Sequence, residues 1–185
     1  MSKLRARATA GLDGEVLEIG FGSGLNVPVY PSKVSRVRAV DPSVTGRKLA
    51  SKRVAASPVP IEYIGRNGEQ VPLEDASVDH VLTTWTLCTI PDVSRAMDEI
   101  HRVLRPGGEM HFLEHGRAPD WEVARWQDRL TPIQRLVAGG CHLNRRIDEL
   151  ITDAGLYITR LDNFFVAGPR AFSYMYQGVA SKSSS

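Results

Sequence analysis

Short apolar segments recur along the first two thirds of the chain, and most of them are followed by a helical pattern. Five segments are bounded by Gly, Pro or Asp, as buried strands are: 15–20, 36–41, 60–65, 78–85 and 108–115. Residues 44–57 and 93–105 follow helical patterns, with Asp92 as the N-cap of the second helix and Pro106 among its stop signals. Strands that alternate with helices predict an α/β fold with a mostly parallel sheet and helices on both faces.

The last quarter of the chain has a different pattern. A helix is expected around 146–154, and two β-rich runs follow it at 156–166 and 170–180. A short turn that contains Gly168 and Pro169 joins the two runs, which is typical of an antiparallel hairpin. We therefore expect this hairpin to close one part of the sheet.

Length and composition indicate one domain. The 185 residues suffice for one core, and 42% hydrophobic and 24% charged residues are ordinary for a soluble globular protein. The domain is expected to span 1–180, and the serine-rich end, 181–185, is expected to be a disordered tail. The sequence has no apolar stretch of membrane-spanning length, no secretory signal and only two cysteines, so we expect a cytoplasmic protein.

Charge is distributed unevenly around a net value of +2. Residues 1–53 hold ten Lys and Arg against four Asp and Glu, whereas the remainder holds thirteen against seventeen. A basic first third allows weak association with a membrane surface, although a mixed, solvated surface is the simpler interpretation. No nucleic-acid motif accompanies the charge, so we expect no nucleic-acid partner, and the oligomeric state stays open.

The segment VLEIGFGSGLN places Gly20, Gly22 and Gly24 directly after the first apolar run. A Walker phosphate loop requires G-x-x-x-x-G-K-[ST], but no lysine lies in or just after this turn. A dinucleotide fold requires G-x-G-x-x-G, whose last glycine would stand where the chain has Leu25. The remaining register is G-x-G-x-G, in which glycine gives the backbone room to approach a ligand.

Four motifs follow one another over about 100 residues: VLEIGFGSG, AVDPS, GRNGEQVPLEDASVDHV and EIHRVLRPGGEMHFLEH. Together they resemble the motifs of class I S-adenosylmethionine-dependent methyltransferases, and more narrowly the ubiquinone/menaquinone-biosynthesis methyltransferase type. The resemblance implies a Rossmann-like, mostly parallel seven-stranded sheet and S-adenosylmethionine as the cofactor. That cofactor carries no phosphate, which agrees with a glycine turn that lacks a lysine.

The resemblance also implies which residues contact the cofactor. Asp41 ends the second strand, where its carboxylate can accept hydrogen bonds from the two ribose hydroxyls. Asn67 and Gly68 are expected near the adenine amino group, although most relatives have Asp at the first position and a simple turn remains an alternative. Thr84 and Glu18 complete the set, and Glu18 could equally be a buried carboxylate that fixes the glycine turn.

Further stretches carry a narrower resemblance: VLEIGFGSGLNVPVYP, WTLCTIPD, FLEHGRAP and GGCHLNRRI. They look like the thiol S-methyltransferases of the membrane-associated methyltransferase-like group. This favours a small, fairly apolar thiol or sulfide as methyl acceptor. The alternatives are C- or O-methylation of a quinol or phenol, N-methylation of a phospholipid head group, and a cofactor-binding protein without activity. Those relatives have an N-terminal apolar anchor that this sequence lacks, and the usual covering helix is expected to be short or missing.

The acceptor is expected beyond the ends of the strands. The candidate acceptor-binding residues are Trp85, Cys88, Trp121, Trp126, Cys141 and Arg145. His115 is the candidate for proton removal or acceptor orientation because histidine titrates near neutrality, and a plain structural role is the alternative. We expect one of Trp121 and Trp126 to line the pocket and the other to pack their helix. We expect no metal, because His111 and His115 share a strand face but lack a third ligand.

Overall fold

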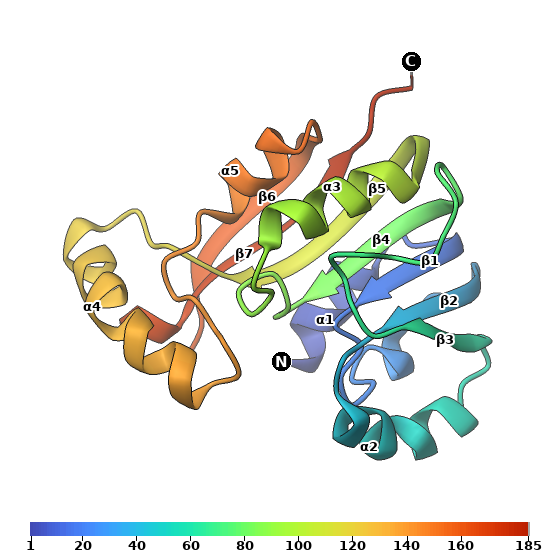
Figure 1. Ribbon diagram of the computed structural model, residues 1–185, viewed down its shortest axis with the longest axis horizontal. Helices are drawn as coiled ribbons and strands as arrows, with labels where there is room; N and C mark the ends of the chain where they lie inside the picture. Colours follow the sequence, from blue (N-terminus) through green and yellow to red (C-terminus); the bar gives the residue numbers. More distant parts are fainter. Residues whose placement is uncertain (185) are drawn as a thin grey trace.

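Seven strands form one sheet in the order β3-β2-β1-β4-β5-β7-β6 in the computed structural model, which describes residues 1–184 (Figure 1). The strands are β1 (Gly14–Ile19), β2 (Val34–Val40), β3 (Ile61–Gly65), β4 (Val78–Thr84), β5 (Leu104–His115), β6 (Tyr157–Phe165) and β7 (Tyr174–Ser181). The strands β1 to β5 pair in parallel, and β7 pairs antiparallel with both β5 and β6. The predicted Rossmann-like sheet with a C-terminal antiparallel hairpin is confirmed.

Helices cover both faces of this sheet. They are α1 (Ser2–Thr9), α2 (Val44–Ala55), α3 (Val93–Val103), α4 (Trp121–Val137) and α5 (Ile147–Asp153), with short 3-10 helices η1 (Val27–Val29) and η2 (Arg170–Phe172). The buried residues of α3 and α5 share one apolar cluster with the sheet, and those of α1 and α2 share another. In contrast, α4 stands beyond the ends of the strands and contacts η2 (Figure 1).

The central strands are apolar on both faces because helices cover both. In β1, Val16 and Leu17 point to opposite faces and are both fully buried. The edge strand β6 is mostly exposed by contrast. α3 begins as predicted, since the Asp92 carboxylate accepts from the Arg95 N–H at 3.1 Å. It ends two residues earlier than predicted, because Leu104 already begins β5.

The two ends of the described chain both pack on the domain. The covering helix at the N-terminus is present but short, with eight residues in α1. At the other end, where the sequence predicts fraying from residue 181, β7 runs to Ser181. The Lys182 ammonium then donates to the carbonyls of His101 and Leu104 at 2.7 and 2.8 Å. Residue 185 of the predicted tail lies outside the described residues.

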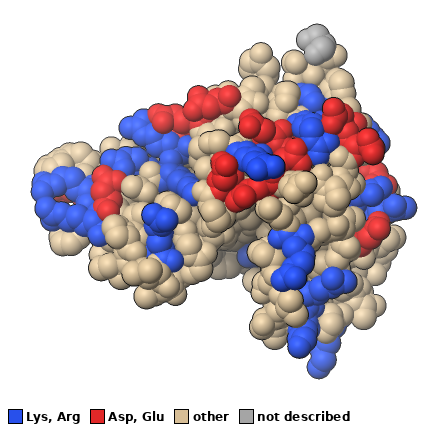
Figure 2. Space-filling view, viewed as in Figure 1, with Lys and Arg blue, Asp and Glu red and all other residues tan. Residues whose placement is uncertain are grey.

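Two lobes flank the ends of the parallel strands. Figure 2 shows the surface indented between the lobe that carries α4 and the lobe that carries α2. Basic side chains gather on α2, which contributes Arg47, Lys48, Lys52 and Arg53 and has no acidic residue. Among residues 1–184, none of the helices has the length and apolar character needed to cross a bilayer.

Candidate active site

The chain leaves β1 through the glycine turn that the sequence singles out. Gly20, Gly22 and Gly24 all have positive φ, at 79°, 54° and 72°, which L side chains rarely adopt. A Cβ at position 20 would overlap the hydroxyl of Thr86, the second residue after β4. Glycine therefore lets the turn lie directly against the end of β4.

Asp41 links this turn to the next helix. Its carboxylate accepts from the Gly22 N–H at 2.6 Å and from the Ser43 N–H at 2.7 Å. A carboxylate offers about four lone-pair sites, so two remain for a ligand. Asp41 also lines the adjoining cleft, where those sites can meet a pair of vicinal hydroxyls.

The cleft has a volume of about 690 Å³ and follows the carboxyl ends of β1 to β4. Its polar residues include Asp41, Asn67 and Glu69, and its apolar residues include Ile19, Val40 and Ile90. Gly20, Gly22 and Gly68 bring main chain to its surface. Clefts at this edge of an open α/β sheet are the usual ligand sites of such folds.

The turn that follows β3 combines both roles that the sequence left open. The side-chain carbonyl of Asn67 accepts from the Glu69 N–H at 2.9 Å, which is the hydrogen bond of a local turn. Asn67 and Gly68 nevertheless line the cleft, and the carbonyl keeps a second lone pair. A Cβ at Gly68 would lie 2.8 Å from Ile19, so this turn packs closely on the end of β1.

Glu18 and Thr84 lie behind the glycine turn, and neither lines the cleft. The Glu18 carboxylate accepts from the Asn26 amide at 3.0 Å and from the Tyr30 hydroxyl. The Thr84 hydroxyl accepts from Asn26 and from the Arg5 guanidinium, both at 3.0 Å. Burial raises the pKa of Glu18 to about 7. The structure therefore supports the alternative for Glu18, a carboxylate that fixes the turn.

Thr84 and Gly24 were also predicted to contact the cofactor, but neither of them lines the cleft. Thr84 belongs to the buried network rather than to the cleft, because alternate strand residues point to opposite faces. Gly24 faces α2, where a Cβ would lie 3.2 Å from Ala50, and it does not line the cleft. Gly20, Gly22, Asp41, Asn67 and Gly68 are the predicted contacts that the structure brings to the cleft.

A second, smaller cavity of about 300 Å³ adjoins the cleft, with Trp85 and Thr89 lining both. Its lining residues come from the segment after β4, the end of β5, α4, the segment after α4 and η2: Trp85, Cys88, Thr89, His115, Gln134, Ala138, Cys141, Leu143 and Phe172. The structure thus brings together four residues that the sequence proposed separately for acceptor chemistry. We call this cavity the acceptor pocket.

The two cysteines interact at the acceptor pocket. A hydrogen bond from Cys88, and then the imidazole of nearby His115, lower the pKa of Cys141. The same hydrogen bond, with burial, raises the pKa of Cys88. Cys141 is the half-exposed thiol and Cys88 the buried one, so the pocket has one thiol disposed to ionise and one that stays protonated.

His115 is the last residue of β5 and is 5% exposed. Within the described part of the chain, neither of its ring nitrogens has a hydrogen-bond partner. Buried polar atoms are normally paired, so an unpaired imidazole at a pocket wall is suited to a ligand. This geometry favours a functional role for His115 over the structural alternative.

Trp85 stands between the two cavities in an unusual conformation. Its φ is 54°, a region that bulky residues rarely occupy, and its N–H donates to the Leu113 carbonyl at 2.9 Å. The Arg5 guanidinium lies over its ring, 4.6 Å from the centroid. Contacts from α1 and β5 therefore hold the residue that divides cleft from pocket.

Glu114 precedes His115 on β5, so its side chain points to the opposite face of the sheet. There it holds the segment that follows β4. Its buried carboxylate accepts from the Thr86 and Leu87 N–H groups at 2.9 and 3.0 Å. Burial raises its pKa to about 7. A carboxylate inside an apolar strand is a sequence signal for such a buried partner.

Trp121 and Trp126 require a correction. They lie on α4 as predicted, but they are 63% and 56% exposed and neither lines the acceptor pocket. Arg125 and Arg129 lie over the two rings. The pocket receives Gln134 and Ala138 from the other end of α4 and the residue after it. The predicted pocket Trp therefore does not reach the cavity beside the cleft; Trp121 instead lines a separate cavity of about 450 Å³ with Arg117 and Tyr174.

Arg145 also lies outside the acceptor pocket. Its guanidinium donates to the carbonyl of Leu87, so it holds the segment that carries Cys88. Burial lowers the pKa of Arg145. Sequence reasoning missed Leu143 and Phe172, whose apolar side chains line the pocket, because their nearness to Cys88 depends on tertiary contacts.

Comparison with known proteins places the chain that forms these two cavities in a family. The methyltransferase domain family matches residues 17–112, slightly more than half of the chain. The chain belongs to the methyltransferase domain family. Its fold resembles that of the YcgJ protein from Bacillus subtilis, with a TM-score of 0.77 over 98% of this chain and 97% of that one at 16% identity.

Two thiol S-methyltransferases are among the similar sequences. TMT1A of Homo sapiens is 37% identical over 145 residues, which are 74% of this chain and 58% of that protein. TMT1B of Rattus norvegicus is 35% identical over 137 residues, which are 70% of this chain and 54% of that protein. The predicted resemblance is confirmed, and the chain spans a little over half the length of these relatives.

The methyl donor of this methyltransferase domain is S-adenosylmethionine. The cleft fits a nucleoside joined to an amino acid, because the Asp41 carboxylate has lone pairs for ribose hydroxyls and Ile19, Val40 and Ile90 offer apolar surface to a base. The crowding at Gly20 leaves main chain rather than a side chain at the floor of the cleft. The residues present therefore agree with this cofactor.

Proposed function

We propose that this methyltransferase domain methylates a small, fairly apolar thiol or sulfide in the acceptor pocket. The observation that carries the proposal is the adjacency of the cleft and the pocket, which share Trp85 and Thr89 as a common wall. The similarity to two thiol S-methyltransferases supports a sulfur acceptor. The volume of about 300 Å³ supports a small one.

A thiol demands little of the protein chemically. S-adenosylmethionine supplies a methyl group made electrophilic by the positive sulfur that carries it. A thiol has a pKa of about 8.5 and its thiolate is a strong nucleophile, so weak base assistance is enough. In the acceptor pocket, an unpaired ring nitrogen of His115 is available to take the thiol proton.

Positioning is the larger contribution that the chain can make. Well-oriented reactants can gain as much as ~7–11 kcal/mol relative to free encounter. Apolar walls from Leu143 and Phe172 would hold the acceptor carbon chain, and Trp85 would set its approach to the cleft. Glu114 and Arg145 fix the segment between Thr86 and Cys88 and so position these walls without lining the pocket.

The test uses isotope-labelled S-adenosylmethionine and a panel of a short alkyl thiol, a quinol, a phenol and a phospholipid amine. We expect labelled methyl thioether from the thiol, detected by mass spectrometry, and less than a tenth of that rate from the others. Methylation confined to the quinol, phenol or amine would overturn the thiol assignment. Cofactor binding by calorimetry without turnover of any acceptor would instead favour a binding protein.

A further inference from the structure

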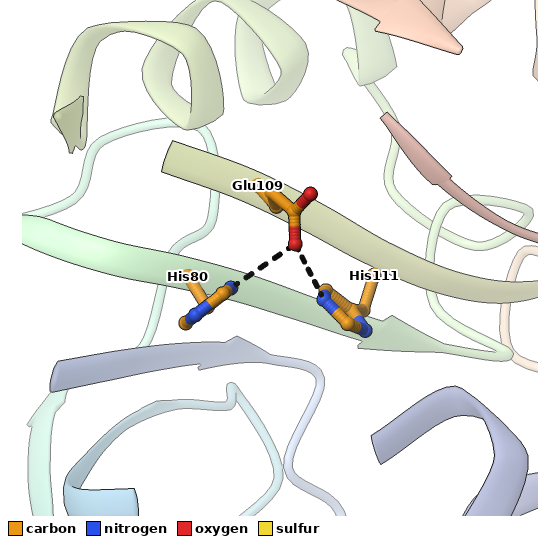
Figure 3. A group of neighbouring side chains, drawn as sticks. All are labelled: His80, Glu109 and His111. Carbon is orange, nitrogen blue, oxygen red and sulfur yellow. Dashed lines mark ion pairs between the residues drawn. The ribbon is translucent and has the colours of Figure 1, made fainter. Parts of the chain in front are cut away.

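Three potential metal ligands meet away from both cavities, on two neighbouring strands. In the parallel pairing of β4 with β5, His80 lies opposite Glu109. His111 follows Glu109 by two residues and therefore shares its face of the sheet. One potential ligand atom from each of the three side chains lies within 4.8 Å of those of the other two. Figure 3 shows both rings directed toward the carboxylate.

The outer nitrogen of each ring has a partner that can only accept. The Nε2 atom of His80 lies 3.1 Å from a carboxylate oxygen of Asp13, and the Nδ1 atom of His111 lies 3.0 Å from the carbonyl oxygen of Ala8. Each outer nitrogen must therefore carry a hydrogen to form these bonds. Such carboxylate and carbonyl partners are the usual outer contacts of histidines that bind metal ions.

In the neutral form of each ring, the other nitrogen, Nδ1 of His80 or Nε2 of His111, then presents a lone pair toward the shared space. Both are buried without a hydrogen-bond partner among the described residues, and the Glu109 carboxylate between them is a further acceptor. Three acceptors that face one another, two of them unpaired and buried, are stabilised by a cation placed among them.

We propose that His80, Glu109 and His111 bind a divalent transition metal ion, with Zn²⁺ as the ion that best suits two imidazoles and a carboxylate. The Nε2 atom of His111 already lies 3.4 Å from the Glu109 oxygen, and the Nδ1 atom of His80 lies 4.0 Å from it. Tetrahedral ligands about 2.0 Å from zinc lie roughly 3.3 Å apart, so these two separations need to shorten by less than about 1 Å, and the separation between the two nitrogens, which is at most 4.8 Å, by no more than about 1.5 Å. Glu109 is 37% exposed and leaves a path for the ion and a water ligand.

The site lies toward the amino ends of the strands, opposite the glycine turn. His111 and His115 are four residues apart on β5, so their Cα atoms are separated by about 13 Å. His111 and His115, for which the sequence already predicts no metal site, are therefore too far apart to share an ion, whereas the sheet register brings His80 and Glu109 to His111. Metal binding here would join β4, β5 and, through Ala8, the end of α1, which indicates a structural role.

The test titrates ZnCl₂ into the purified full chain after treatment with a chelator. We expect one zinc per chain by elemental analysis and calorimetry, and a rise in the thermal unfolding midpoint. Glu109→Gln, which keeps the shape of a partly exposed side chain, should weaken zinc binding at least tenfold. Asp13→Asn should weaken it about 10-fold to 100-fold by removing an outer partner. Unchanged circular dichroism would show that both variants fold.

A competing zinc site at the cysteines is tested in the same experiment. Cys141→Ser should leave zinc affinity within twofold of wild type, and Co²⁺ bound in place of zinc should give a tetrahedral absorption spectrum without sulfur-to-cobalt charge transfer. The proposal is overturned if Glu109→Gln binds zinc as tightly as wild type. It is also overturned if Cys141→Ser abolishes binding, or if the wild-type chain binds no zinc at micromolar concentration.

Discussion

The N–H of Gly22 donates to the carboxylate of Asp41 at 2.6 Å, and this bond joins the turn after β1 to the end of β2. The other oxygen of Asp41 accepts from Ser43 and fixes the start of α2. Asp41 therefore serves the fold and the cleft together. Its removal has two consequences that can be measured separately, one on ligand affinity and one on stability.

Asp41→Ala should weaken S-adenosylmethionine binding at least 30-fold. Two hydrogen bonds between a carboxylate and ribose hydroxyls are lost, each worth roughly 1.5–3 kcal/mol, and the glycine turn loses its anchor. Calorimetry measures the affinity, and urea unfolding measures the stability. Asp162→Asn is the matched control, because Asp162 forms an exposed ion pair with Arg7 far along the sheet. Equal cofactor affinity in Asp41→Ala and wild type would rule out the ribose contact.

His115→Ala should lower turnover of an alkyl thiol about 10²-fold or more at pH 7 while cofactor affinity changes less than threefold. The expected loss follows from general-base assistance, which typically contributes 10²-fold to 10⁴-fold. The loss should shrink as the pH approaches that of thiol ionisation, since a preformed thiolate needs no base. Trp126→Ala on the exposed face of α4 is the control. Full activity of His115→Ala at pH 7 would assign His115 a structural role.

The sheet was predictable because its central strands are apolar on both faces, as Val16 and Leu17 illustrate. The glycine turn and Asp41 were also predictable, since both follow directly from local sequence. In contrast, Trp121 and Trp126 were misplaced because a helical pattern cannot tell where α4 stands relative to the sheet.

Positions near the ends of strands were the other source of error. Glu18 and Thr84 point into a buried network whose partners, Asn26 and Arg5, are fixed by tertiary structure. His80 and His111 are 31 residues apart in sequence, and their meeting likewise depends on the register between β4 and β5. Non-local pairing of this kind leaves no signal in a single sequence.

Stability should fall as the pH rises from about 5 to about 7. Burial raises the pKa of Glu18 from 4.5 in the unfolded chain to about 7, so the folded state holds more protons in this window. The stabilisation is complete below about pH 4.5 and is lost as the pH rises through 7. The loss amounts to about 3 kcal/mol for this one group.

Glu18→Gln keeps a neutral side chain at every pH and should remove this share of the slope. Urea unfolding between pH 5 and pH 8 measures the free energy of unfolding directly, and Glu114, whose pKa burial also raises, should leave a residual slope. Glu62→Gln is the control, because the Glu62 side chain is 57% exposed. A Glu18→Gln variant with the same pH slope as wild type would contradict the raised pKa.

The two thiols of the acceptor pocket should react at different rates. The hydrogen bond from Cys88 and the nearby His115 lower the pKa of Cys141, whereas the pKa of the buried Cys88 is raised. Because the thiolate is the reactive species, iodoacetamide at pH 7 should alkylate Cys141 at least tenfold faster than Cys88. Peptide mass spectrometry over a time course measures both rates.

Cys88→Ala should slow alkylation of Cys141 several-fold, because the thiolate loses its hydrogen-bond donor while its exposure does not fall. Cys88→Ser, which can still donate, should retain most of the rate and separates hydrogen bonding from packing. A saturating alkyl methyl thioether, which resembles the expected product and does not consume iodoacetamide as a free thiol would, should protect Cys141 by filling the pocket that it lines. Equal alkylation rates for the two cysteines in the wild-type chain would refute the lowered pKa of Cys141 and the raised pKa of Cys88. Absence of protection would show that the acceptor binds elsewhere.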